Sequence, residues 1–237
     1  GRLLADTVEI PVTRISMDDA TAIEAGARGS RFVWRGRTVE LPIGGRFNIA
    51  NALAAGTAAG LIGIDDATIV RGLAAAPAVP GRFESVDAGQ PFAVIVDFAH
   101  KPDALAAVLA AARQAADGRV IVVFGCGGDR DPSKRAVMGA AAARRADVVF
   151  VTSDNPRSED PAAIMAAIMS GIPSSSTAIV HQEPDRRAAI AAAIASARAG
   201  DVVVIAGKGH ETTQTFADRV VPFDDRQVAR ELLESLA

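Results

Sequence analysis

Residues 146–161 read ADVVFVTSDNPRSEDP and place an apolar run directly before a loop rich in charge. The run is short and lacks polar alternation, which is typical of a strand that is buried on both faces. The loop brings together Asp154, Asn155 and Arg157, and the ring of Pro156 restricts its backbone. The stretch predicts a buried strand whose carboxyl end presents an acid, an amide and a guanidinium group.

The same unit recurs from residue 81 onward. Apolar runs at 92–97, 119–125, 147–154, 176–180 and 201–207 alternate with segments of helical periodicity at 101–115, 133–146, 161–171, 183–200 and 224–236. Apolar strands that alternate with amphipathic helices indicate a parallel sheet covered on both faces. The predicted fold class is α/β, with a Rossmann-like, mostly parallel sheet and helices on both faces.

The first 80 residues have a different rhythm. Short strands are expected at 7–12 and on either side of a tight turn at Arg35–Arg37, followed by a helix at 46–63 that Gly63 ends. A second helix is expected at 65–76, with Asp65 as its cap. The segment 76–82 contains Pro77 and Pro80 and is the expected linker, so the predicted domains are 1–80 and 81–237.

Composition limits the class of protein. The net charge of −3 gives no reason to expect nucleic acid or an anionic membrane as a partner. The single cysteine, Cys126, fits a reducing cytoplasm, and the first residues do not resemble a signal peptide. Because the chain begins with Gly1 and not with Met, we expect it to be processed or part of a longer protein.

Four loops are expected at the carboxyl ends of the strands, where parallel sheets bind their ligands. They are DFAHKPD (97–103), GCGGDRDPSKR (125–135), TSDNPRSEDP (152–161) and GKGHE (207–211). Five cations lie on three of these loops: Arg130, Lys134, Arg135, Arg157 and Lys208. Acids stand beside them: Asp129, Asp131, Asp154, Glu159 and Glu211. A site with both signs of charge suits a zwitterion better than a bare phosphate.

Other interpretations stay open on the residues alone. Asp97 and His100 are also compatible with a helix cap and a surface histidine, and Cys126 with a small packing residue. A dinucleotide-dependent oxidoreductase is disfavoured, because Arg130 stands where the third glycine of the fingerprint is needed. A non-catalytic amino-acid-binding module is the remaining alternative. No G-x-x-x-x-G-K-[ST] motif is present, so the chain has no P-loop of its own.

Seven ordered blocks resemble the Mur ligase family. They are GGRFNIANALAA, VPGRFE, VDFAHKPDAL, VVFGCGGDRDPSKRAVMG, VTSDNPRSEDP, IAGKGHETTQ and PFDDRQVA, and Phe98 stands where that family usually has tyrosine. The resemblance implies the tail of a central P-loop ATPase domain joined to a complete C-terminal amino-acid-binding domain. It implies ATP and Mg²⁺ as cofactors, with the metal ligands in a segment that this chain lacks. On this basis the chain is expected to be inactive by itself, monomeric and cytoplasmic.

The resemblance also assigns roles to residues. Nucleotide contacts are implied for Asn48, Asn51, Arg82 and Asp97, and catalytic contacts to the phosphates for His100 and Lys101. The implied small-molecule substrates are meso-diaminopimelate and a UDP-N-acetylmuramoyl dipeptide. The DNPR signature of the family recognises meso-diaminopimelate, whose side chain ends in both an ammonium and a carboxylate. The residues implied to bind it are Arg130, Asp154, Asn155, Pro156, Arg157, Gly207 and Glu211. A lysine-adding relative is the alternative, and Arg157 argues against it, because lysine lacks the second carboxylate.

Overall fold

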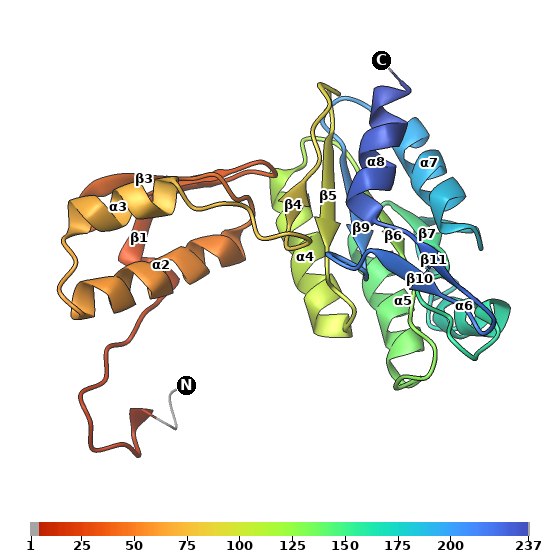
Figure 1. Cartoon of the computed structure of the whole chain (residues 1–237), viewed down its shortest axis with the longest axis horizontal. Helices are drawn as coiled ribbons and strands as arrows, with labels where there is room; N and C mark the ends of the chain where they lie inside the picture. The colour runs from red at the N-terminus through yellow and green to blue at the C-terminus, as the bar shows by residue number, and fades with distance from the viewer. Residues whose placement is uncertain (1–4, 237) are drawn as a thin grey trace.

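The chain forms two lobes of unequal size (Figure 1). The structure, a computed structural model, describes residues 5–236; residues 1–4, on which the expectation of no signal peptide rests, and residue 237 lie outside the described part. In the N-terminal lobe, an antiparallel sheet of order β1-β2-β3 packs against two helices. Its elements are η1 (Met17–Asp19), β1 (Ala20–Ala25), β2 (Ser30–Trp34), β3 (Arg37–Leu41), α2 (Arg46–Leu61) and α3 (Asp66–Ala74).

Local chemistry explains the boundaries within this lobe. The turn between β2 and β3 has Arg35 and Gly36 at φ of 49° and 72°, the left-handed pair that suits a two-residue hairpin. Asp65 caps α3 by accepting a hydrogen bond from the Thr68 N–H, as predicted. Trp34 is buried between the hairpin and α2, and Gly63 lies just beyond the end of α2 with a φ of 93°.

The strand expected at 7–12 is wrong. These residues form no strand, and Val8, Ile10 and Val12 are exposed. The segment runs apart from the three-stranded sheet (Figure 1), so its alternating apolar pattern has no neighbouring strand with which to form a ladder.

The C-terminal lobe is built on a six-stranded sheet of order β4-β5-β9-β6-β7-β8. All pairings except that of β4 with β5 are parallel, which confirms the predicted fold class. The strands are β4 (Glu84–Ser85), β5 (Ala93–Asp97), β6 (Val120–Phe124), β7 (Val148–Val151), β8 (Ile179–Gln182) and β9 (Val202–Ala206). The helices are α4 (Pro102–Ala115), α5 (Lys134–Arg145), α6 (Pro161–Met169), α7 (Arg186–Ser196) and α8 (Asp225–Glu234).

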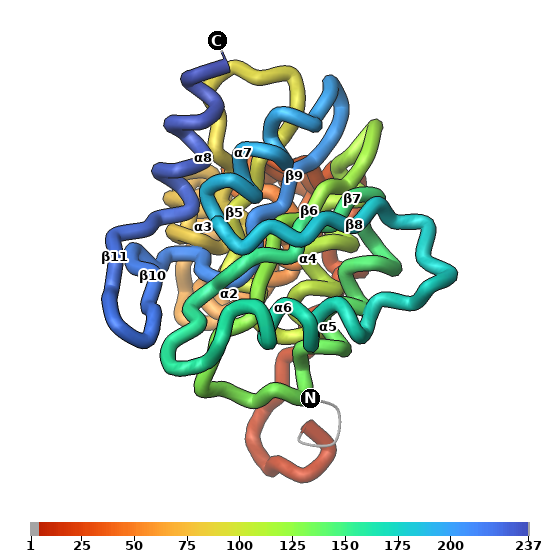
Figure 2. Tube along the Cα trace, turned by 90° about the vertical axis from the view of Figure 1, so that its right-hand side faces the viewer, coloured from red at the N-terminus to blue at the C-terminus, as the bar shows by residue number. Residues whose placement is uncertain are grey.

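Two hydrophobic clusters explain why the strands are apolar on both sides. Residues of α4, α5 and α6 pack on one face of the sheet together with Ile95, Val122 and Val204. Residues of α7 and α8 pack on the other face against neighbouring strand positions such as Val94 and Val203. Figure 2 shows these helices on opposite sides of the strands. Because alternate strand residues enter opposite clusters, the central strands β6, β7 and β9 consist of apolar residues throughout.

The sequence patterns missed two features of this lobe. A small antiparallel hairpin, β10 (Thr213–Thr215) and β11 (Val220–Pro222), follows β9, and β8 begins at Ile179 instead of near residue 176. Both involve strands of three or four residues with polar members, which periodicity cannot distinguish from loop.

The segment between Ala75 and Phe83 contains no helix or strand and joins the lobes. Across it, the rings of Phe47 and Phe83 meet edge to face at 5.3 Å, and Arg28 pairs with Asp87 at 3.2 Å. The domain boundary near residue 80 stays a prediction. In the described part of the chain, no helix combines the length and apolar composition needed to cross a membrane.

One ion pair is completely enclosed in the C-terminal lobe. Arg186, at the start of α7, binds both carboxylate oxygens of Asp225, at the start of α8, at 2.8 and 2.7 Å. Both side chains are 0% exposed. The guanidinium also donates to the carbonyl oxygens of Ser153 and Ala206. Four elements, α7, α8 and the ends of β7 and β9, therefore meet at one arginine.

Replacing Arg186 with methionine should lower the free energy of unfolding by about 3–5 kcal/mol, because Asp225 would be left as a buried, unpaired charge. The double change Arg186→Met with Asp225→Leu should recover most of that loss. Urea denaturation of the chain measures both effects. The matched control is Arg187→Met, because the side chains of Arg187 and its partner Glu231 are both about half exposed. This change should lower the free energy of unfolding by less than about 1 kcal/mol. Equal losses from Arg186→Met and Arg187→Met would contradict this role for the buried pair.

Candidate functional site

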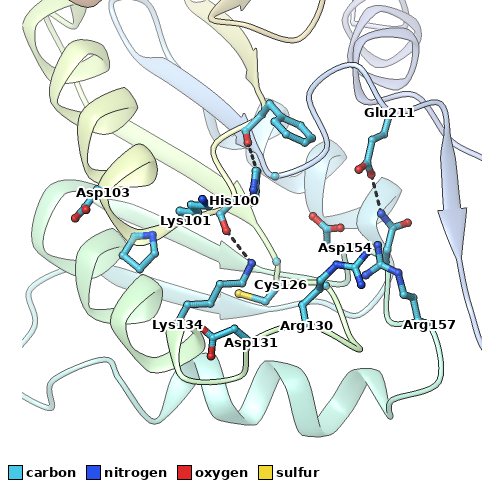
Figure 3. Close-up of a pocket in the computed structure, with 16 residues that line it drawn as sticks. His100, Lys101, Asp103, Cys126, Arg130, Asp131, Lys134, Asp154, Arg157 and Glu211 are labelled. Carbon is cyan, nitrogen blue, oxygen red and sulfur yellow. Dashed lines mark hydrogen bonds between the residues drawn. The ribbon is translucent and has the colours of Figure 1, made fainter.

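A cavity of about 540 Å³ opens at the carboxyl ends of β5, β6, β7 and β9 (Figure 3). It brings together predicted residues from all four loops: His100, Lys101, Arg130, Asp154, Asn155, Arg157, Gly207 and Glu211. In the view of Figure 3, Arg130, Asp154, Arg157 and Glu211 gather at one side, and Lys101 and Lys134 lie at the other. The site is assembled because β9 inserts between β5 and β6, so that loops distant in sequence become neighbours.

Asp154 presents an unusual carboxylate to this cavity. The residue is only 7% exposed, yet its carboxylate accepts no hydrogen bond from the residues that the structure describes. Its main-chain oxygen is held by the Gln214 side chain at 2.8 Å. Gly207 gives it room, since a Cβ there would lie 2.5 Å from Asp154 Oδ2, and the φ of 118° also disfavours any side chain. The charge of Asp154 helps to raise the pKa of the buried Arg186 guanidinium, but the oxygens of its carboxylate remain without a hydrogen-bond donor, which is costly unless a ligand supplies one.

Arg157 sits in a strained backbone conformation. Its φ of 53° is in the left-handed region, which is uncommon for residues other than glycine. The Arg157 N–H donates to the Thr215 carbonyl at 3.0 Å, and its Nη1 donates to the Gly128 carbonyl at 2.7 Å. The first bond holds the main chain and the second holds one arm of the half-buried guanidinium. The other arm makes no hydrogen bond to the described residues and is left for the cavity.

The hairpin β10–β11 supports the loop that carries Asp154, Asn155 and Arg157. The Gln214 side chain donates to the Asp154 carbonyl oxygen, and the Arg157 N–H donates to the Thr215 carbonyl oxygen. In addition, the Thr215 N–H donates to Asn155 Oδ1 at 2.9 Å. On the other side, Gly128 approaches so closely that a Cβ would lie 1.8 Å from the Pro156 oxygen. Pro156 itself is buried behind the cavity and does not line it. It therefore contributes rigidity and not a contact to a ligand in this cavity.

Two of the five expected cations are not open to the cavity. Lys208 is 0% exposed and bonds to Asn155, Glu211 and the Thr213 carbonyl. Arg135 is also buried and pairs with Glu159 at 2.8 Å. These two cations lie on the predicted loops but do not face the cavity, because their side chains turn back to acceptors within the loops.

The residues predicted to contact a nucleotide lie outside the cavity. Asn48 donates to the Gly44 carbonyl at 2.8 Å, and Asn51 donates to Asn48 at 3.1 Å, both on α2. Arg82 is exposed and stacks its guanidinium over the Phe98 ring at 4.8 Å. Phe98 lines the cavity, so Arg82 is one side chain away from it.

The Asp97 side chain is hydrogen-bonded to the end of the linker. The residue is 8% exposed, and its Oδ2 accepts a hydrogen bond from the Phe83 N–H at 2.7 Å. Burial raises the pKa of this carboxyl above its ordinary value, although hydrogen bonds from the N–H groups of Phe83 and Ala99 oppose the effect. In this structure the carboxylate joins the end of β5 to the linker.

The opposite side of the cavity contains a histidine of defined orientation. His100 Nδ1 lies 2.8 Å from the Phe98 carbonyl oxygen. Because a carbonyl only accepts, Nδ1 must carry the proton, and Nε2 is the acceptor of the neutral ring. Lys134 donates to the His100 carbonyl at 2.8 Å, and Asp103 and Asp131 add acids to the lining. The sequence had suggested charge at Lys134 and Asp131, and it placed Phe98 and Asp103 on a predicted site loop without giving either a role.

Two simpler chemistries find no support among the described residues. Cys126 is 2% exposed, and burial raises the pKa of its thiol to about 12, so it fits a packing residue better than a nucleophile. Within residues 5–236, no group of three or more His, Cys, Asp or Glu side chains is arranged to hold a metal ion.

Comparison with known proteins identifies relatives of both lobes. The UDP-N-acetylmuramoyl-L-alanyl-D-glutamate--2,6-diaminopimelate ligase of Streptomyces avermitilis is 46% identical over 249 residues, which cover 99% of this chain and 49% of the relative. The protein of the same name from Solibacter usitatus is 54% identical over 197 residues, 83% of this chain and 40% of that one. The chain thus spans about half the length of the curated relatives it matches.

Solved structures give the same answer. A structure of a protein with that name matches at a TM-score of 0.70 and 37% identity, over 92% of this chain and 45% of the other. Folylpolyglutamate synthase from Mycobacterium tuberculosis shares the fold at a TM-score of 0.59 and 24% identity, over 79% of this chain and 44% of the other. A family model described as "Mur ligase, glutamate ligase domain" matches residues 81–209. The chain belongs to the Mur ligase family.

Proposed function

We propose that this chain is the amino-acid-binding part of a cytoplasmic, ATP-dependent ligase of peptidoglycan synthesis. The reaction joins meso-2,6-diaminopimelate to the D-glutamate γ-carboxylate of UDP-N-acetylmuramoyl-L-alanyl-D-glutamate. The observation that carries the proposal is the 7% exposed carboxylate of Asp154, which accepts no hydrogen bond from the described residues and lies in the same cavity as Arg130 and Arg157. The printed names of the relatives support it, because they specify this amino acid and this acceptor.

The cavity suits a ligand that ends in both an ammonium and a carboxylate. Arg157 offers a planar guanidinium arm that binds a carboxylate in two places, and Arg130 adds a second, exposed guanidinium. Asp154 and Glu211 offer acceptors for the ammonium. L-lysine would satisfy the acids but leave Arg157 without its carboxylate, so the site should select against it.

The remaining groups suit the reacting end of the substrate. A bound amine must lose a proton to attack an activated carboxyl group, and His100 Nε2 is a proton acceptor on the same side of the lining as Lys101. Lys101 is exposed at the same side and offers a positive charge to a phosphoryl group. Both roles are proposed from position and hydrogen-bonding capacity.

ATP, when bound, would supply the phosphoryl group that activates the γ-carboxylate. Arg82 suits a nucleotide contact because its guanidinium is exposed and held on Phe98 at the rim of the cavity. Asn48 and Asn51 each keep a second amide hydrogen for a nucleotide contact, whereas Oδ2 of Asp97 is already engaged by the Phe83 N–H. The described residues do not form a Mg²⁺ site.

Arg157 should decide which amino acid is accepted. Loss of one charge-assisted, bidentate contact should lower kcat/KM for meso-diaminopimelate by roughly 30- to 1000-fold, equivalent to about 2–4 kcal/mol. L-lysine, already a poor substrate, should change far less, and Arg157→Lys should recover only part of the loss. The ligase for this test is assembled from this chain and the remaining half of the S. avermitilis relative. The measurement is kcat/KM for each of the two amino acids, in the unaltered ligase, in Arg157→Ala and in Arg157→Lys.

Arg144→Ala is the matched control, because it removes an exposed arginine of α5 that does not line the cavity. If Arg157→Ala lowers kcat/KM for both amino acids by the same factor, Arg157 only supports the loop, and its assigned contact to the carboxylate is wrong.

Residues proposed to contact the nucleotide and residues proposed to contact the amino acid should affect different KM values. In the same assembled ligase, Arg82→Ala and the isosteric Asp97→Asn should raise KM for ATP more than KM for meso-diaminopimelate. Arg130→Ala should do the reverse, because its guanidinium lines the cavity with Asp154. The check is the pair of KM values in each variant, with urea denaturation to verify folding. Parallel changes in both KM values for all three variants would refute the division.

A further inference from the structure

Lys208 is a buried cation that the proposed reaction does not use. It follows Gly207 at the carboxyl end of β9, is 0% exposed and does not line the cavity. Its ammonium meets only acceptors: Asn155 Oδ1 at 3.2 Å, Glu211 Oε2 at 3.4 Å and the Thr213 carbonyl. Burying an ammonium is costly, and the same volume filled by an apolar side chain would often be as stable. Its neighbours therefore indicate what it is for.

The amide of Asn155 has a single allowed orientation. Its Oδ1 lies 3.2 Å from Lys208 Nζ and 2.9 Å from the Thr215 N–H, and both of these groups can only donate. Its Nδ2 lies 2.7 Å from Glu211 Oε2, and an ionised carboxylate can only accept. If the amide were flipped, its NH₂ group would face the two donors, Lys208 Nζ and the Thr215 N–H. Its oxygen would then face the carboxylate of Glu211, and none of these three hydrogen bonds could form.

This orientation decides what the cavity presents to a ligand. Both lone pairs of Asn155 Oδ1 are used by the protein, so the side chain offers a ligand only its second Nδ2 hydrogen. Asn155 therefore selects an acceptor such as a carboxylate. Glu211 keeps Oε1 for the cavity, and its side chain is 35% exposed. It therefore selects a donor such as an ammonium.

We propose that Lys208 is a positioning residue that fixes the hydrogen-bonding polarity of the cavity, with a donor at Asn155 and an acceptor at Glu211. It acts through these two side chains and contacts no substrate. The assignment of the donor to the distal carboxylate of a diamino acid rests on the proposed function. The orientation of the amide does not, and it can be tested in the chain without any ligand.

The first test follows the Asn155 side-chain amide by ¹H–¹⁵N NMR in the chain, with Asn155→Asp to assign its pair of signals. In Lys208→Met these signals should shift, and their exchange with water should accelerate by about tenfold or more, since one of the two anchors of Oδ1 is lost. Lys134→Met is the matched control, because it removes a lysine that bonds to the His100 carbonyl and not to Asn155. Unchanged Asn155 signals in Lys208→Met would overturn the proposal.

A measurement on the unaltered chain keeps the proposal testable if Lys208→Met does not fold. A buried, hydrogen-bonded ammonium should give a slowly exchanging Nζ signal with a nuclear Overhauser contact to Asn155, whereas exposed Lys101 should give none. Absence of that signal and contact would also overturn the assignment.

The second test measures selectivity in the assembled ligase. Lys208→Met should lower the ratio of kcat/KM for meso-diaminopimelate over L-lysine by about tenfold and leave KM for ATP unchanged. If the NMR signals respond but this ratio does not, Lys208 orients the amide and the proposed amino-acid specificity is wrong. If neither responds, the proposal for Lys208 fails by itself, whatever the ligand.

Discussion

The buried ion pair of Arg186 and Asp225 is the contact on which the geometry of the site depends. The guanidinium donates hydrogen bonds to Asp225 and to the carbonyl oxygens of Ser153 and Ala206. Those carbonyls directly precede Asp154 and Gly207, which lie against each other in the lining of the cavity. Burial by itself would lower the pKa of the Arg186 guanidinium, but Asp225, Asp154 and Glu211 together outweigh this effect and raise it. The arginine therefore remains charged, and it joins the ends of β7 and β9 to the first turns of α7 and α8.

Strand order converts that anchor into a site. β9 is the last strand of the sheet in the sequence, yet it lies between β5 and β6. The loops after residues 97, 124, 151 and 206 consequently open at one edge, although more than a hundred residues separate the first from the last. Parallel strands impose this arrangement because all their carboxyl ends point the same way.

Rigidity at the edge comes from neighbouring loops that bind one another. Asp129 has a left-handed φ of 53° and accepts hydrogen bonds from the hydroxyl and N–H of Ser158. These two hydrogen bonds hold the pKa of the Asp129 carboxyl below its ordinary value. Arg157 carries a similar strain in the facing loop and is held by Gly128 and Thr215. Two strained residues in facing loops, each held by polar contacts, indicate a site organised before its ligand arrives.

The sequence by itself determined the layered α/β fold, since uninterrupted apolar runs such as VVFV of β7 are stable only when helices cover both faces of the sheet. It also determined which loops carry the site, because strand ends can be located from where those runs stop. It did not determine where each charged side chain points. Lys208 and Arg157 stand on neighbouring loops and looked equivalent, yet one is enclosed and the other reaches the cavity. That difference depends on the β10–β11 hairpin and on acceptors far away in the chain, such as the Asn155 amide and the Gly128 carbonyl. Only tertiary structure decides it, because hydrogen-bond partners are set by proximity in space and leave no period in the sequence.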